Sequence, residues 1–157
     1  MKVRLIEAKL FPGIHKEIRV LEIKNGYNKA FFASDFHCED SCKTLSLLFN
    51  LALKKGCDAL VILGDLFEDF HRQAGTNEVE ERVLKMIGFK NMERIINLIY
   101  VLSSASHDPI ILRPSIRIRS KLRLILSPYP VYLRVSNLSI IATHGEIIIG
   151  NGALVHM

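Results

Sequence analysis

Short polar islands that are rich in Asp and His follow apolar runs at several places in this chain. These islands are residues 34–37, 64–68, 106–108 and 143–145. The ends of strands that converge on one edge of a sheet are where α/β proteins build binding sites. Carboxylate and imidazole groups brought to one point are suitable ligands for a divalent metal. The sequence therefore predicts a metal site formed at strand ends.

The spacing within the islands supports this prediction. Asp35 and His37 lie two residues apart, so both side chains can reach one metal from a turning segment. Asp65 follows Gly64, which permits a tight turn, and its carboxylate can bridge two metals. His144 offers another imidazole. Two metals about 3.5–4 Å apart can clamp a phosphate and generate a hydroxide nucleophile.

The order and spacing of the islands resemble the calcineurin-like metallophosphoesterase superfamily. Its pattern is D-x-H, G-D-x-x-D/E, G-N-H-D/E, a His that often precedes Gly, and finally G-H-x-H. The corresponding segments here are Asp35-Phe36-His37, Gly64-Asp65-Leu66-Phe67-Glu68, Ala105-Ser106-His107-Asp108 and Thr143-His144-Gly145. The resemblance covers roughly residues 28 to 146 and implies an α/β fold, a layered β-sandwich flanked by helices. We expect residues 1–157 to form a single domain of this kind.

The resemblance also implies roles for individual residues. The implied metal ligands are Asp35, His37, Asp65, Ser106 and His144. Asp65 would bridge two divalent ions, for which Mn²⁺ is the expected metal and Fe, Zn, Ni or Co are substitutes. His107 would act as the general acid on the leaving oxygen, and Asp108 would orient it. A hydroxide that bridges the metals would attack phosphorus in line.

The chain departs from the family pattern at two points. Ser106 replaces the Asn of the third motif, and a hydroxyl is the weaker ligand, so the second metal should bind less tightly. No G-H-x-H follows His144. His156 and Glu146 remain as substitute ligands, although a terminal residue such as His156 is expected to fray. The chain is thus expected to be C-terminally shortened, to be one piece of a split protein, or to be completed by a partner.

Two functions follow from this pattern. The leading one is a metal-dependent phosphoesterase that acts on phosphomonoesters or phosphodiesters, including nucleotides or nucleic-acid ends. The alternative is a catalytically weak or inactive scaffold for protein interaction, which Ser106 and the missing last motif favour. The retained His107 and Asp108 favour the enzyme. A shortened sheet would also expose an edge, which predicts a homodimer or a partner subunit that covers it.

Composition sets broader limits. Of 157 residues, 49% are hydrophobic, so the chain can bury a sizeable core. The apolar runs are too short for a transmembrane helix, and no signal peptide is recognised, so we expect a cytoplasmic protein without membrane contact. The three cysteines lack a paired C-x-x-C spacing and are expected to be reduced thiols. The net charge of +5 favours an anionic partner.

Periodicity and turn signals predict the elements. Strands are expected at residues 2–11, 15–24, 29–34, 59–63, 122–126, 131–135 and 138–143, and helices at 41–55 and 77–87. The turn signal Asn25-Gly26 predicts that the first three strands form an antiparallel meander. Residues 95–102 are expected to be partly helix and partly strand.

Two basic segments could serve the site. Positive residues alternate at period two, which in a strand would give either a cationic stripe for phosphate or a solvated face. They are Arg117, Arg119, Lys121 and Arg123. His71-Arg72 follows the second motif and is expected either to line the substrate pocket or to be ordinary loop polarity.

Overall fold

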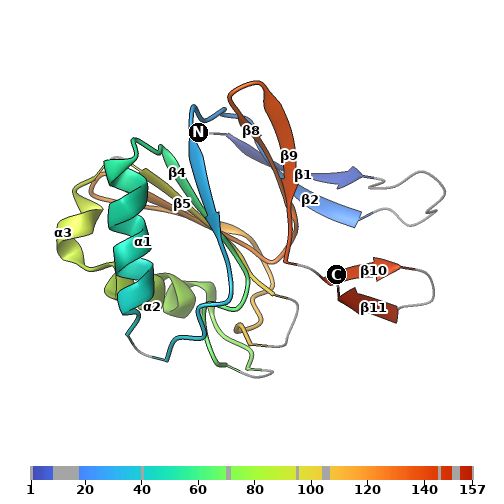
Figure 1. Cartoon of the computed structure of the whole chain (residues 1–157). Coiled ribbons are helices and arrows are strands. Elements are labelled where there is room, and N and C mark those ends of the chain that lie inside the picture. The colour runs from blue at the N-terminus through green and yellow to red at the C-terminus, as the bar shows by residue number, and fades with distance from the viewer. Residues whose placement is uncertain are drawn as a thin grey trace.

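A computed structural model describes residues 2–8, 18–39, 41–69, 72–94, 96–103, 107–144, 146–149 and 153–156. Most described strands form two sheets (Figure 1). The five-stranded sheet has the order β3 (Ala30–Ala33), β4 (Ala59–Leu63), β5 (Ile96–Val101), β7 (Leu122–Ser127), β6 (Ser115–Arg119). The four-stranded sheet has the order β1 (Val3–Ala8), β2 (Ile18–Ile23), β8 (Val131–Val135), β9 (Leu138–Ala142).

Both sheets mix strand directions. Strands β3, β4, β5 and β7 run parallel, and β6 pairs antiparallel with β7. In the other sheet, β2 pairs parallel with β8, whereas β1 with β2 and β8 with β9 are antiparallel. A separate antiparallel hairpin contains β10 (Glu146–Ile149) and β11 (Ala153–His156).

The two faces of the five-stranded sheet bury different cores. Leu60 and Ile62 of β4 pack in a cluster with residues of α1 (Lys43–Lys54) and α2 (Thr76–Ile87). Val61, on the opposite face, belongs to a cluster that includes residues of the four-stranded sheet. Alternation along one strand thus places helices on one face and a second sheet on the other, as Figure 1 shows. This confirms the predicted α/β sandwich flanked by helices.

The predicted helices are confirmed, with small shifts at their N-termini. Helix α1 begins at Lys43 rather than at Ser41, and α2 begins at Thr76 rather than at Asn77. Gly56 and Gly88 follow the helix ends with φ of 71° and 81°, the left-handed conformation that glycine adopts without strain. A short helix, α3 (Phe89–Met92), comes next along the chain. Within the described ranges, no helix is both long and apolar enough to cross a membrane.

The predicted antiparallel meander is wrong at its third strand. Strand β3 pairs parallel with β4 in the other sheet and makes no pair with β2 among the described ladders. Gly26 lacks the positive φ that a tight type I′ hairpin needs. The Asp58 carboxylate instead accepts hydrogen bonds from the N–H groups of Asn28 and Lys29 at 2.8 and 3.0 Å, which fixes the start of β3 beside β4.

Two further expectations are corrected. Residues 96–101 are entirely strand, because β5 lies between β4 and β7 and its backbone groups pair on both sides. The expectation of three reduced thiols is wrong for Cys38 and Cys42, which form a disulfide. The turn between β3 and α1 brings their Cα atoms to 5.5 Å, inside the range that a disulfide spans. Cys57 is free and buried.

Two sequence predictions concern an exposed sheet edge and the fraying of His156. Strand β9 ends the four-stranded sheet, with β8 as its one neighbour in the described part of the chain. A homodimer or partner subunit that covers this edge stays a prediction. In the last hairpin, the register pairs Glu146 with His156, so the backbone at His156 lies in a strand instead of fraying.

Candidate functional site

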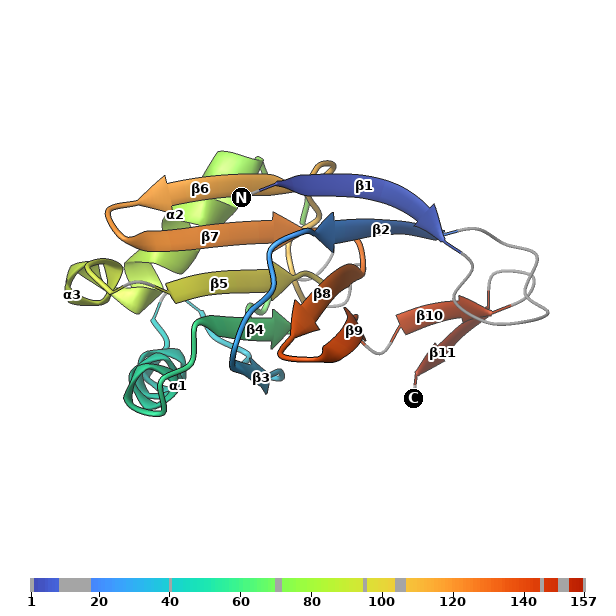
Figure 2. The ribbon, with the colours of Figure 1, turned by 90° about the horizontal axis from the view of Figure 1, so that it is seen from above.

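The predicted ligands Asp35, His37 and Asp65 lie beyond the carboxyl ends of neighbouring parallel strands, whereas His144 follows β9 of the other sheet. The register aligns Ala33 with Ile62, and Leu63 with Val101, so β3, β4 and β5 end at one edge of the sheet. Figure 2 shows the arrowheads of β4, β5 and β7 at this common edge. Segments that are far apart in the sequence therefore deliver their polar residues to one place.

The loops after β3 and β4 hold three of these residues in an uncommon backbone conformation. Asp35, His37 and Asp65 have φ of 59°, 50° and 52°, in the left-handed region that non-glycine residues seldom occupy. The N–H groups of Phe36 and His37 both donate to the Asp65 carbonyl at 2.9 Å. The two loops thus support each other's strained geometry, which is typical of functional sites.

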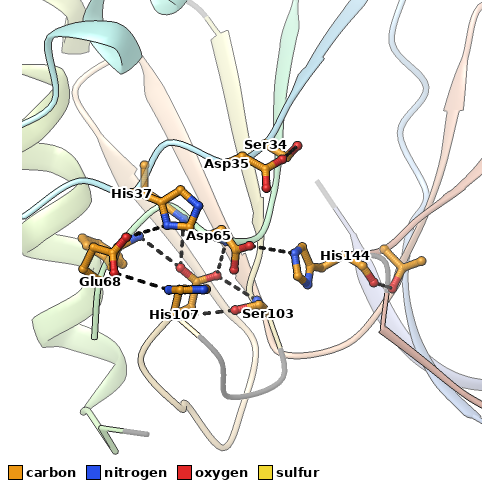
Figure 3. A network of polar contacts seen from close by, with 12 residues as sticks. Ser34, Asp35, His37, Asp65, Glu68, Ser103, His107 and His144 are labelled. Atoms are coloured by element: carbon orange, nitrogen blue, oxygen red, sulfur yellow. Dashed lines mark hydrogen bonds and ion pairs between the residues drawn. The ribbon is translucent and has the colours of Figure 1, made fainter. Parts of the chain in front are cut away.

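This geometry brings carboxylate and imidazole groups together (Figure 3). Single ligand atoms of Asp35, His37 and Asp65 all lie within 4.8 Å of one another. His144 approaches from the end of β9, with Nε2 at 3.1 Å from Asp65 Oδ2. Asp65 is 7% exposed, and its Oδ1 is buried without a hydrogen-bond partner among the described residues. A buried carboxylate oxygen in this state is costly unless a ligand satisfies it.

A glycine makes room for the His144 ring. Gly64 has φ of 68°, and a Cβ added there would lie 2.3 Å from His144 Cδ2. No side chain fits between β4 and the ring at that distance. The Gly64 N–H also donates to the Val101 carbonyl at 2.7 Å, which ties the turn to β5. Glycine at this position therefore lets the imidazole reach Asp65.

Glu68 lies between two imidazoles, a position that the sequence did not indicate. Its Oε1 lies 2.6 Å from His37 Nδ1, and its Oε2 lies 3.4 Å from His107 Nδ1. The two rings meet edge to face with centroids 4.6 Å apart. At 2.6 Å, the Glu68 carboxylate accepts from His37 Nδ1, which leaves Nε2 as the nitrogen of His37 that can bind a metal. The position of Glu68 at the end of the G-D-x-x-D/E motif was the sequence feature that could have indicated a role at the site.

Asp108 holds the backbone of the second motif through hydrogen bonds. It is fully buried, and its carboxylate accepts hydrogen bonds from the N–H groups of Asp65, Leu66 and Phe67 at 2.9, 3.0 and 3.2 Å. It also accepts from the Ser103 N–H at 2.8 Å and from the Tyr100 hydroxyl. Several donors thus satisfy the oxygens of this buried carboxylate. These bonds give Asp108 a supporting role for the Asp65 turn that the sequence did not indicate.

Tyr100 remains a hydrogen-bond donor in this network. Burial raises the pKa of Tyr100 well above its ordinary value, and the neighbouring Asp108 carboxylate raises it further. The phenol is therefore protonated at neutral pH and donates to Asp108.

Asp69 connects the second motif to the third and to helix α2. Its N–H donates to the His107 carbonyl at 2.6 Å. Its carboxylate pairs with Arg82, whose guanidinium also lies 4.1 Å from the centre of the Phe67 ring, and with Arg72. Burial alone would raise the pKa of Asp69, but the hydrogen bonds and charges of the two arginines lower it below its ordinary value.

A comparison with protein families identifies the family to which this fold belongs. The family described as calcineurin-like phosphoesterase matches residues 29–156. The chain belongs to the calcineurin-like phosphoesterase family. No curated protein and no solved structure matches it. Family membership indicates metal-dependent action on phosphate esters in general, and divalent metals are the usual cofactors of calcineurin-like phosphoesterases.

The described residues fit the divalent metals of a calcineurin-like phosphoesterase. The donors are carboxylate oxygens and imidazole nitrogens, the ligand set that suits first-row divalent ions. A bound cation would explain why Asp65 Oδ1 has no hydrogen-bond partner among the described residues, and why Gly64 leaves space for His144. Ser106, predicted as a ligand from the altered third motif, lies outside the described residues, as does His71.

The predicted cationic stripe does not lie on one strand. Arg117 and Arg119 lie on β6, and Arg123 lies on β7. Arg117 pairs with Glu80 at 2.8 Å and with Glu81 at 2.5 Å, and the side-chain hydrogen bond to Glu80 raises its pKa above the ordinary value. The period-two pattern failed because a turn separates the residues into two strands and acidic residues of α2 neutralise part of them.

Proposed function

We propose that this protein hydrolyses phosphomonoesters or phosphodiesters with two divalent metal ions, Mn²⁺ being the preferred metal. One observation carries the proposal. Asp35, His37 and Asp65 converge from two loops, and the buried Asp65 Oδ1 has no partner among the described residues. Carboxylate and imidazole donors in this arrangement suit Mn²⁺, and Fe, Zn, Ni or Co could take its place.

Named residues would hold these ions. Asp35 and His37 would bind the first, His144 the second, and Asp65 both, with Ser106 proposed as a weaker additional ligand. When bound, the metals supply Lewis-acid polarisation of the phosphoryl group and activation of water. His37 presents Nε2 for this purpose because its Nδ1 faces Glu68 at 2.6 Å.

His107 is proposed as the general acid. Its Nδ1 faces Glu68 at 3.4 Å, so a proton held at Nε2 is the one available for the leaving alcohol oxygen. The carboxylate of Glu68 beside Nδ1 limits rotation of the His107 ring. The hydrogen bond from the Asp69 N–H to the His107 carbonyl holds the backbone of this residue beside the second motif.

One experiment on a single sample tests the proposal. The protein is loaded with excess Mn²⁺ and desalted, its metal content is measured by elemental analysis, and turnover of bis-p-nitrophenyl phosphate and p-nitrophenyl phosphate is recorded. We expect close to two metals per chain with turnover, and loss of both in Asp65→Asn. Less than one metal per chain without turnover of either ester would refute the proposal.

A further inference from the structure

An apolar cleft continues the site along the same edge of the five-stranded sheet. It has a volume of about 300 Å³. Its walls are Leu102 and Ser103 at the end of β5, residues 109–112 after the third motif, and Pro128 with Tyr129 at the end of β7. The volume reaches the lower limit for pockets that hold small organic ligands. Because the metal residues follow β3 and β4, the cleft occupies the next strand ends in line.

A smaller cavity borders both this cleft and the candidate metal ligand His144. It has a volume of about 120 Å³ and shares Leu102, Pro128 and Tyr129 with the cleft. Thr143 and His144 complete its wall. His144 Nε2 lies 3.1 Å from Asp65 Oδ2. A molecule whose phosphate lies at Asp65 could therefore extend past His144 into the cleft.

The walls select for hydrocarbon. None of the described residues that line either cavity is Asp, Glu, Lys or Arg. Leu112, at the cleft, is 69% exposed. Covering this apolar surface with a ligand would be favourable, because it removes the surface from water. A sugar or a second phosphate would lose water there without finding charged partners.

A larger cavity among the described residues has the opposite character. It lies between α2 and β6, with a volume of about 550 Å³, and Glu80, Glu81 and Arg117 line it. These charges pair with one another, and no predicted metal ligand borders the cavity. It therefore has neither an available charge for an anion nor continuity with the site.

We propose that the apolar cleft binds the alcohol portion of the substrate, and that this portion is a hydrocarbon group carried by a small phosphoester. The inference rests on the proposed function for the position of the phosphate. The cleft itself is a separate feature of the fold and can be tested separately.

The test compares hexylphosphonate with methylphosphonate, which share a head group and resist hydrolysis. Binding to the Mn²⁺-loaded protein is measured by calorimetry. We expect hexylphosphonate to bind at least tenfold more tightly, and this preference to fall at least threefold in Leu112→Gln and in Tyr129→Ala. Leu47→Gln is the matched control, because Leu47 is also 69% exposed but lies on α1. Equal affinity for the two phosphonates, or a preference that survives in both cleft variants, would overturn the inference.

A second measurement separates this inference from the proposed function. Binding of 1-hexanol to the metal-free protein is followed by saturation-transfer NMR, with the same three variants. Weakened transfer in the cleft variants, with no change in Leu47→Gln, supports the cleft even if no phosphoester is hydrolysed. Turnover of bis-p-nitrophenyl phosphate without any saturation transfer from hexanol would support the proposed function and refute the cleft as a hydrocarbon-binding site.

Discussion

The Asp65 N–H donates a hydrogen bond of 2.9 Å to the buried carboxylate of Asp108, 43 residues further along the chain. Asp65 contributes the carboxylate at the centre of the proposed metal site, and Asp108 holds the backbone that aims it. The same Asp108 carboxylate accepts from Tyr100 on β5 and from Ser103 after it. The turn that follows β4 is therefore fixed through β5 and the third motif.

Asp108→Asn should destabilise the protein by about 3 kcal/mol, because the amide cannot accept from all the donors and leaves buried N–H groups unpaired. Tyr100→Phe removes a single donor and should cost about 2 kcal/mol. Urea unfolding measures both. If Asp108→Asn unfolds at the wild-type urea concentration, the carboxylate does not organise the turn.

Glu68→Gln should lower turnover of bis-p-nitrophenyl phosphate by about 10- to 100-fold, the usual effect of removing a group that orients metal-binding or catalytic imidazoles. A Gln side chain has one acceptor oxygen, so it cannot place an oxygen beside both histidines as Glu68 does. Glu39→Gln is the matched control, since Glu39 is an exposed carboxylate two residues after His37. Equal turnover in the two variants would show that Glu68 orients neither ring.

His107→Ala should reduce turnover by roughly 10²-fold or more, whereas the metal content after Mn²⁺ loading should stay close to that of the wild type. The reason is that His107 is proposed to donate a proton and not to bind metal. Elemental analysis and rate measurement on one sample distinguish the two roles. Loss of metal in step with activity would make His107 a ligand instead.

Gly64→Ala tests the fit of His144 against the turn after β4. Both Gly64 and Gly56 have positive φ, so alanine at either should cost about 1 kcal/mol through backbone strain. At Gly56 nothing lies within 4 Å of the added Cβ, whereas at Gly64 it meets the His144 ring at 2.3 Å. We expect Gly64→Ala alone to lower Mn²⁺ affinity, by about tenfold. Matching Mn²⁺ titrations for the two variants would contradict the proposed position of His144.

The raised pKa of Tyr27 predicts that its ionisation contributes to the loss of stability at alkaline pH. Burial raises the pKa of Tyr27 to about 12, opposed by the charge of Arg123 and reinforced by that of Asp58. A raised folded pKa gives a contribution that is complete below the unfolded pKa of about 10 and is lost as the pH rises towards 12. In Tyr27→Phe, the free energy of unfolding should therefore fall less steeply between about pH 10 and 12. Urea unfolding across this range checks the slope, and parallel curves for variant and wild type would exclude this contribution.

The sequence by itself determined those features that depend on neighbouring residues. The helices α1 and α2, the glycines that end them and the buried strand β4 follow from periodicity, composition and local backbone freedom. Asp35, His37 and Asp65 could be selected as candidates because each follows a strand, and strand ends gather at a sheet edge.

The tertiary structure alone decided which distant groups meet. Asn25-Gly26 has the composition of a hairpin turn. However, hydrogen bonds to the Asp58 carboxylate hold the start of the following strand, β3, in the other sheet. Nothing in the spacing of Glu68 and His107 shows that one carboxylate lies between two imidazoles, or that Asp108 lies beneath Asp65. Sequence patterns report local preference, whereas the position of a buried polar group depends on which long-range partners satisfy it once the sheets have packed.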